Sequence, residues 1–418
     1  TLNFIRRKEM EIQSFVPVPY WKVNAETVID GEVYSLEYEE STLRREVVTR
    51  LIAKKCRGKT GKITNITRNI ERKLPPYSFN LSDLQREAHR VFKISPKETL
   101  NIAEKLYLSA EISYPRTDSQ KIPASIDIRT ILQKLRLNKD YSVIVDKILE
   151  KETFSPRQGN KDDPAHPAIH PTGEKPKNIK GNYKKIYDLI VKRFLSCLSE
   201  PAKVSKTIME VDVEGFLFYI RGSETIRRGW MDFYEPYVRQ KEVLLPGLEE
   251  NMDIPLTKLG TRRHYTNAPN RFNASSILRY MENKNIGTKA TRTNILDTLY
   301  NRDYIKGKSI KITELGFSII KTLSNFCDEI LSVEMTRELE KKLDMIQSGN
   351  LNWERAIDEV KTELRPILST FKSNEEKIGS EIAKTILSID REENYLGSCP
   401  SCEDGEIFIR TNPKTAKI

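Results

Sequence analysis

A tyrosine, a proline and an arginine stand together as Tyr114-Pro115-Arg116, and Asp118 follows two residues later. A phenol with its ordinary pKa of about 10 is a poor nucleophile at neutral pH unless a neighbouring cation stabilises its anion. Arginine keeps its charge and can bind a phosphate through two parallel hydrogen bonds. These residues would suffice for attack on a phosphodiester. Taken alone, however, they are explained better by a turn with a buried tyrosine and a surface Arg–Asp pair.

Two of the chain's four histidines, His166 and His170, lie within five residues of each other. Residues four apart share one face of a helix, which would suit a zinc ion. Pro167 and Pro171 follow the two histidines directly and disfavour that helix. We therefore predict a loop that presents one or both imidazoles to a phosphate or to a proton in transit.

Cys399 and Cys402 form a Cys-x-x-Cys pair ahead of Gly405 and a strand, which is the pattern of the first half of a zinc ribbon. A structural zinc site needs two further ligands, and the 16 residues after Cys402 contain neither cysteine nor histidine. We expect no metal at this pair unless a partner completes the site. The other three cysteines are widely scattered, which favours a reducing, intracellular compartment over a disulfide framework.

The charge of the chain indicates a polyanionic partner. Its 70 Lys and Arg residues exceed its 59 Asp and Glu residues by 11, an excess that suits nucleic acid, although a lysine-rich proteome would also produce it. No stretch approaches the roughly 18 consecutive apolar residues of a transmembrane helix, so we expect no membrane partner. The sequence has no glycine-rich phosphate loop for ATP and no Asp-x-Asp-x-Glu cluster for magnesium.

Several domains must position these residues, because 418 residues exceed what one hydrophobic core usually supports. Period-two alternation predicts strands within 14–80, with a turn at Asp30-Gly31, and again within 207–220. Between them, helical periodicity predicts a block of about 125 residues, the pattern of one domain inserted into another. We expect Ser82 and Ser95 to be the N-caps of its first two helices, with Glu98 as the capping-box partner of Ser95.

The last helical region resembles a winged helix, a common reader of nucleic acid. We predict its helices at 273–283, 288–302 and 313–323, with a short strand pair near 304–308. The helix–turn–helix–strand order carries this interpretation.

Six motifs in unbroken order, covering nearly the whole chain, resemble the type IA DNA topoisomerases, most of all the archaeal topoisomerase I and the topoisomerase III members. The family's active-site Tyr-Pro-Arg-Thr-Asp-Ser is present at 114–119, and its His-x-Ala-Ile-x-Pro-Thr at 166–172. The remaining motifs are Leu-Gln-x-x-Ala at 84–88, Thr-Leu-x-x-Ala-x-x-Leu-Tyr at 99–107, Ile-Gly-x-x-x-Thr at 286–291 with a downstream Arg-x-Tyr at 302–304, and Thr-x-x-Leu-Glu-x-x-Leu-Asp at 336–344.

The resemblance implies a mixed α and β, multidomain fold. This is the toroidal type IA core, with a β-rich arch, an inserted helical domain that carries the tyrosine and a helical winged-helix-like domain. The implied limits are 1–25 for the start of the helical DNA-binding domain, 26–80 and 206–250 for the β-rich domain, 81–205 for the tyrosine domain, 251–375 for the rest of the DNA-binding domain, and 376–418 for a linker and an incomplete zinc ribbon.

The same resemblance assigns roles to residues. Tyr114 would attack a phosphodiester of single-stranded DNA, form a 5′-phosphotyrosyl link and free a 3′-hydroxyl, so that resealing needs no ATP. Arg116 would stabilise charge on the tyrosinate and the scissile phosphate. His166 would contact the scissile region or assist proton movement, and Asp118 would orient neighbouring groups or cap the turn. DNA-binding residues would be Gln85, His170, Thr288, Lys289, Thr291 and Arg302, with Lys289 replacing a charge that the family usually supplies as arginine.

Family members begin with an acidic Toprim domain that binds Mg²⁺ and faces the tyrosine, and Thr1-Leu2 resembles the residues just after it. We therefore expect a monomeric fragment that binds single-stranded DNA but cleaves little without its own Toprim domain. The zinc site would be complete only in the full-length protein, which we expect in the cytoplasm at the nucleoid. Two alternatives remain: a non-catalytic winged-helix protein, which would not need the tyrosine and histidine motifs, and the topoisomerase half of a reverse gyrase.

Overall fold

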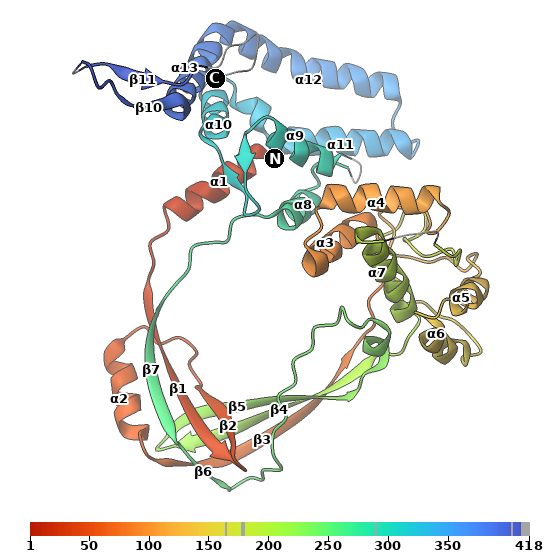
Figure 1. Cartoon of the computed structure of the whole chain (residues 1–418), viewed down its shortest axis with the longest axis vertical. Helices are drawn as coiled ribbons and strands as arrows, with labels where there is room; N and C mark the ends of the chain where they lie inside the picture. Colours follow the sequence, from red (N-terminus) through yellow and green to blue (C-terminus); the bar gives the residue numbers. More distant parts are fainter. Residues whose placement is uncertain (164, 177–179, 289–290, 403, 411–418) are drawn as a thin grey trace. The chain divides into compact units, whose positions relative to one another are not determined.

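A computed structural model of the chain describes residues 1–163, 165–176, 180–288, 291–402 and 404–410 (Figure 1). The chain divides into two compact units. Thr1–Ser14 and Pro269–Ile418 form one of them, and the intervening Phe15–Ala268 forms the other. The described residues contain thirteen α-helices and a seven-stranded sheet, which confirms the predicted mixture of α and β. The six domain limits stay predictions. No helix in the described ranges is long and apolar enough to cross a membrane.

The seven-stranded sheet lies in the unit Phe15–Ala268, and all its neighbouring strands are antiparallel. Its hairpin between the first two strands turns at Asp30 and Gly31, whose φ angles are 52° and 83°. Two positive values are what a two-residue type I′ turn requires, so the predicted turn is confirmed. The strand order is β6 (Asp253–Pro255), β3 (Thr60–Lys73), β4 (Ala202–Val213), β5 (Phe216–Arg227), β2 (Glu32–Tyr38), β1 (Pro19–Ile29) and β7 (Lys258–Tyr265).

A helix that the sequence pattern did not predict, α2 (Glu46–Cys56), packs against β1 and β7 (Figure 1). Its buried residues are spaced as one helical face: Thr49, Ile52, Ala53 and Cys56. Ile52 and Cys56 join an apolar core that contains buried residues of β1 to β6, and Leu259 of β7 packs against it. The sequence pattern did not predict this buried face because it is short and because threonine and cysteine give a weak apolar signal.

The predicted helical block is confirmed between β3 and β4. It consists of α3 (Leu81–Phe92), α4 (Pro96–Leu108), α5 (Ile128–Arg136), α6 (Ser142–Leu149) and α7 (Asn182–Cys197). The helix α7 forms the centre of its core, with Ile186, Leu189, Ile190 and Phe194 fully buried.

The N-caps of this block agree only in part with the sequence. Asn80, not Ser82, caps α3, because its side chain accepts a hydrogen bond from the N–H of Asp83 at 2.8 Å. Ser95 caps α4 as predicted, and its Oγ accepts from the N–H of Glu98 at 3.2 Å. The Glu98 carboxylate does not complete the expected box, since it accepts from Asn182 at 2.7 Å.

A buried polar cluster connects the end of the sheet to the helical block. After β5, the short 3-10 helix η1 (Gly229–Phe233) leads to Tyr234, whose hydroxyl donates to Glu87 of α3 at 2.9 Å. Burial alone would raise the pKa of the Glu87 carboxyl. Hydrogen bonds from Arg90 and Tyr234, together with the charge of Arg193, nevertheless hold that pKa below its usual value. The cluster thus fixes α3, which positions the site described below.

The other unit is mainly helical. Its core brings Leu2, Phe4 and Ile5 of α1 (Leu2–Gln13) together with Ile277 and Met281 of α8 (Ala274–Asn283). The predicted three helices and short strand pair are confirmed as α8, α9 (Arg292–Asn301), β8 (Ile305–Lys306), β9 (Lys311–Ile312) and α10 (Glu314–Phe326). The later elements are η2 (Asp328–Leu331), α11 (Val333–Gln347), α12 (Trp353–Ser373), α13 (Glu375–Asn394), β10 (Tyr395–Ser398) and β11 (Glu406–Phe408).

Candidate active site

A tight turn at the end of α4 leads the chain to Tyr114. Ala110 has a φ of 58°, in the left-handed region. The N–H groups of Ala110 and Glu111 donate to the carbonyl oxygens of Tyr107 and Leu106, at 2.8 and 2.9 Å. This pair of bonds is a Schellman motif, which ends a helix and redirects the backbone. The chain therefore leaves the direction of α4 before it reaches the tyrosine.

The tyrosine segment, residues 111–117, runs beside the histidine loop, residues 166–172. Most of the hydrogen bonds between them involve main-chain atoms, so the relation of the two segments depends on the path of the chain more than on exposed side chains. The contacts include Ser113 N–H to the His170 carbonyl oxygen at 2.9 Å, Thr172 N–H to the Glu111 carbonyl oxygen at 3.1 Å, Thr117 Oγ1 to the His166 carbonyl oxygen at 3.0 Å, the Ser113 hydroxyl between the Ala168 carbonyl oxygen and the His170 N–H at 3.3 and 3.0 Å, and a β-bridge between Ile112 and Pro171.

The start of α3 joins the same cluster. The N–H of Leu81 donates to the carbonyl oxygen of Thr117 at 3.0 Å, and Asn80 Nδ2 donates to the carbonyl oxygen of Asp118 at 3.1 Å. The start of α3, the tyrosine segment and the histidine loop, which are far apart in the sequence, therefore meet at one place in this unit.

Tyr114 is half-buried and lies between two rings. The His166 ring centroid is 4.5 Å from that of Tyr114, at an interplanar angle of 50°, and the Tyr107 ring meets it edge-on at 5.2 Å. An imidazole in contact with a phenol is well placed to take or return a proton through a small movement or one water molecule. The structure thus brings Tyr114 and His166 together, and the catalytic roles expected for them stay predictions.

Arg116 is bound to a residue that the sequence analysis missed, Glu104 of α4. Its Nε and Nη2 atoms both donate to Glu104 Oε1, at 2.6 and 2.5 Å. About a third of each side chain is exposed. The pair joins residues twelve apart across the turn that ends α4, and no spacing rule of a single helix or strand predicts such a contact. The guanidinium is therefore held in place beside the tyrosine segment by a carboxylate.

The main chain of Asp118 and the ring of His170 are held by hydrogen bonds in this cluster. The Asp118 carbonyl oxygen accepts from the cap residue Asn80, and its N–H points to Asp163 Oδ2 at 3.4 Å. His170 is buried, and its Nδ1 donates to the carbonyl oxygen of Ala168 at 2.8 Å. Burial lowers the pKa of His170, so its ring stays neutral. The His170 ring is thus buried and hydrogen-bonded within the histidine loop, and its DNA-binding role stays a prediction.

Gln85 is placed in the same way. It is buried in α3, and its Nε2 donates to the carbonyl oxygen of Pro96, which joins α3 to the start of α4. The predicted DNA contact would require this side chain to leave its position. The geometry supports a structural role here.

The other predicted DNA-binding residues lie in the unit formed by Thr1–Ser14 and Pro269–Ile418. Thr288 and Thr291 are exposed before α9, and the Thr291 hydroxyl accepts from the Thr288 N–H at 2.9 Å. Arg302 is exposed at the end of α9, and among the described residues its side chain has no hydrogen bond or ion pair. Lys289 falls outside the described residues. Their DNA-binding roles stay predictions.

The cysteine pair lies at the end of the β10–β11 hairpin. Cys399 N–H donates to the Gly405 carbonyl oxygen at 2.6 Å, and a Cβ on Gly405 would meet Cys402 Sγ at 2.5 Å. Hydrogen bonds from the Ser401 N–H and from Cys402 lower the pKa of Cys399. Tetrahedral zinc needs four ligands. Within the described ranges no third His, Cys, Asp or Glu joins the pair, so these residues alone do not fit a closed zinc site.

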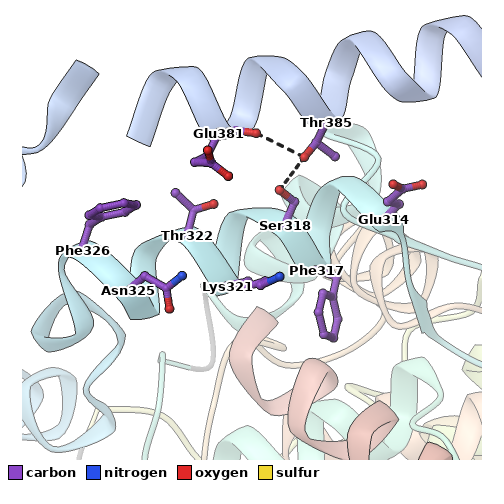
Figure 2. A pocket seen from close by; sticks show the side chains of 9 residues that line it. All are labelled: Glu314, Phe317, Ser318, Lys321, Thr322, Asn325, Phe326, Glu381 and Thr385. Carbon is purple, nitrogen blue, oxygen red and sulfur yellow. Dashed lines mark hydrogen bonds between the residues drawn. The ribbon is translucent and has the colours of Figure 1, made fainter. Parts of the chain in front are cut away.

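One other depression is a cleft of about 320 Å³ between α10 and α13 (Figure 2). Its only hydrogen bonds among the labelled residues join Ser318 Oγ to Thr385 Oγ1 at 2.7 Å, and Thr385 Oγ1 to the Glu381 carbonyl oxygen at 3.2 Å. Neither hydroxyl is paired with a base, so the cleft offers no activated nucleophile.

Comparison with known proteins shows the family of this chain. The family model described as DNA topoisomerase matches residues 1–358, and the chain belongs to the type IA DNA topoisomerase family. It is 39% identical to DNA topoisomerase 1 of Pyrococcus horikoshii over all of this chain and 61% of that protein. It is 38% identical to DNA topoisomerase 1 of Methanocaldococcus jannaschii, over 98% of this chain and 54% of that protein.

The fold is also similar to a solved structure. Full-length topoisomerase I from Thermotoga maritima superposes with a TM-score of 0.71 and 23% identity, over 89% of this chain and 61% of that one. The chain therefore spans about 55–60% of the length of the relatives it matches.

Proposed function

We propose that this chain carries the cleaving tyrosine of an ATP-independent type IA topoisomerase, which cuts single-stranded DNA, passes a strand and reseals the break to relax or decatenate DNA. The observation that supports it most is the contact between Tyr114 and His166 at the point where the tyrosine segment, the histidine loop and the start of α3 meet. The toroidal arrangement implied by the resemblance stays a prediction.

In the proposed reaction, Tyr114 Oη forms a bond to the phosphorus of a phosphodiester, and the bond from phosphorus to the 3′-oxygen breaks. The phenol proton leaves Tyr114, the 3′-oxygen gains a proton, and His166, whose ring contacts that of Tyr114, is a group that can take or supply one. One phosphoester replaces another of similar energy, so resealing by the reverse step needs no ATP. Arg116 stabilises the negative charge on the phosphate.

The type IA family is typically dependent on Mg²⁺. Among the residues the structure describes, no group of three or more His, Cys, Asp or Glu is placed to hold a metal ion. The residues at hand therefore do not fit a magnesium site, and we derive no step through the metal. We propose that a Toprim domain of the whole protein holds it.

Covalent capture of DNA tests the proposal. The full-length protein, with Mg²⁺ and a 3′-labelled single-stranded oligonucleotide, should yield a denaturation-resistant protein–DNA adduct that keeps the label, because the tyrosine stays linked to the 5′-phosphate of the 3′ fragment. Tyr114→Phe should abolish the adduct. Tyr107→Phe is the matched control, because it removes the neighbouring, exposed phenol that contacts the same ring, and it should keep the adduct. An adduct that survives in Tyr114→Phe would refute the assignment of Tyr114 as the nucleophile. No adduct in the wild type would refute the proposed function and favour the non-catalytic alternative.

A further inference from the structure

Much of the chain's excess positive charge lies in a short segment that the proposed cleavage site does not use. Residues 44–62 contain eight Lys and Arg residues and a single acidic residue, Glu46, a net charge of +7 against +11 for the whole chain. All eight basic side chains are exposed. They are Arg44, Arg45, Arg50, Lys54, Lys55, Arg57, Lys59 and Lys62.

These cations form a row on and around α2, and we call this row the α2 basic surface. The inner face of α2 is packed on the sheet through its buried residues, so the charged side chains project from the remaining faces. Arg45 and Arg57 are the residues that flank the helix at its two ends. At a rise of about 1.5 Å per residue, the row between them is roughly 18 Å long.

Most of these charges are not neutralised by the protein itself. Arg50 pairs with Glu46 at 2.5 Å, Lys59 pairs with Glu214 at 3.0 Å, and Lys55 lies over the Phe216 ring. The side chains of the other five have no hydrogen bond or ion pair with any residue in the described part of the chain. The surface therefore presents a largely uncompensated positive field.

The position of two arginines is unfavourable for the helix itself. Cations near a helix C-terminus are favoured by the helix dipole, which accounts for Lys54, Lys55 and Arg57. Arg44 and Arg45 lie at the N-terminus, where the dipole opposes positive charge. Arg45 occupies the N-cap position without a side-chain cap hydrogen bond, where Ser, Thr, Asp or Asn would stabilise the helix by about 1 kcal/mol. A bound anion would remove this conflict, whereas a merely solvated surface would not.

The composition of the surface points to the chemistry of its ligand. Residues 44–62 contain no aromatic side chain and no histidine, although proteins that hold single strands usually stack bases on aromatic rings. A row of cations without stacking groups suits contact with phosphates alone, which is how proteins bind duplex DNA without reading its sequence. Val47 and Leu51 are exposed between the cations, so an anionic membrane is the competing ligand to test.

We propose that the α2 basic surface is a second DNA-binding site, which binds the phosphate backbone of duplex DNA independently of sequence. The inference rests on the proposed function, since that function supplies the DNA. It concerns a surface separate from the Tyr114 site.

Salt-dependent binding to a 30-base-pair duplex tests the proposal. We would replace Arg44, Arg45, Lys54 and Arg57 by glutamine, which keeps long side chains and removes four charges. The slope of log K against log salt concentration should decrease by about 0.9 for each phosphate that is no longer neutralised, and by roughly 3.6 if all four side chains bind DNA. The matched control replaces four exposed lysines elsewhere, namely Lys139, Lys147, Lys341 and Lys377, and should change the slope by less than 1.

Three further measurements keep the result interpretable. Tyr114 adduct formation on a single-stranded oligonucleotide by the full-length protein should be unchanged in the four-site variant, which separates this proposal from the proposed function. Arg44→Gln with Arg57→Gln, both outside α2, should lower the slope by about 1.8 if the larger variant does not fold. A duplex slope equal to that of the control would refute the proposal. The proposal would also be refuted if the four-site variant lost binding to vesicles of phosphatidylglycerol and phosphatidylcholine but kept its binding to duplex DNA. That result would identify a membrane surface.

Discussion

Glu104 should weaken the binding of DNA by competing for Arg116. Two donors of the Arg116 guanidinium lie on one oxygen of Glu104, at 2.6 and 2.5 Å, so the edge that would grip a phosphate is already occupied. The two side chains are 29% and 34% exposed, and a pair this accessible to solvent contributes about 0.2–1 kcal/mol. A phosphate that takes this edge must overcome the same energy.

Glu104→Gln should therefore tighten binding of a single-stranded oligonucleotide. Glutamine keeps the length of the side chain and removes its charge, and 1 kcal/mol corresponds to about a fivefold change in Kd. We expect Kd to fall by up to about fivefold, measured by fluorescence anisotropy at about 0.1 M salt. Glu98→Gln is the matched control, because Glu98 lies on the same helix but contacts Asn182, and it should change Kd by less than twofold.

The assignment of this effect to Arg116 requires a double-mutant cycle. In an Arg116→Gln background, Glu104→Gln should have no more effect than the Glu98→Gln control, because there is no guanidinium left to release. Weaker binding in the single variant Glu104→Gln would show that the carboxylate orients Arg116 for DNA instead of competing with it. An equal decrease in Kd on Glu104→Gln in the wild type and in the Arg116→Gln variant would show a general charge effect. Either result would refute the reasoning.

Three further predictions concern stability. Ala110→Gly should raise the free energy of unfolding by about 0.5–1 kcal/mol in a urea titration, since φ of 58° strains an alanine but not a glycine; no gain would mean that the turn is relaxed. Gly316→Ala should lower the free energy of unfolding by about 1–3 kcal/mol, because the new Cβ would clash with the Tyr304 carbonyl oxygen. The control Gly379→Ala should not destabilise the protein, because its Cβ would meet no atom within 4 Å. Burial lowers the pKa of His170, so the unfolded chain binds the proton more readily, and stability present above about pH 6.5 should be lost as the pH falls. His170→Gln should therefore reduce the fall in Tm between pH 7 and pH 5. An unchanged fall in Tm would show that other groups cause it.

The sequence predicted those parts of the site that depend on local rules. Pro167 and Pro171 excluded the helix that would have formed a zinc site, and the histidines do lie in a loop beside the tyrosine segment. The contact between Glu104 and Arg116 could not be predicted in this way, because it depends on the direction in which the Schellman turn sends the chain. Gln85 and His170 belong to family motifs, but a motif does not distinguish residues that touch a ligand from residues that support them. Only their burial in the structure does.

The division of the chain into a continuous unit and an interrupted one has a consequence for synthesis. The helix α1 finds its core partners in α8, which follows the whole of Phe15–Ala268. At about 5–20 residues per second, a ribosome needs roughly 13–50 s to produce those residues. During that interval Leu2, Phe4 and Ile5 lack their core partners in α8, whereas the inserted unit has all of its own strands and helices as soon as Ala268 is made. We therefore expect the inserted unit to complete its own core before α1 meets α8.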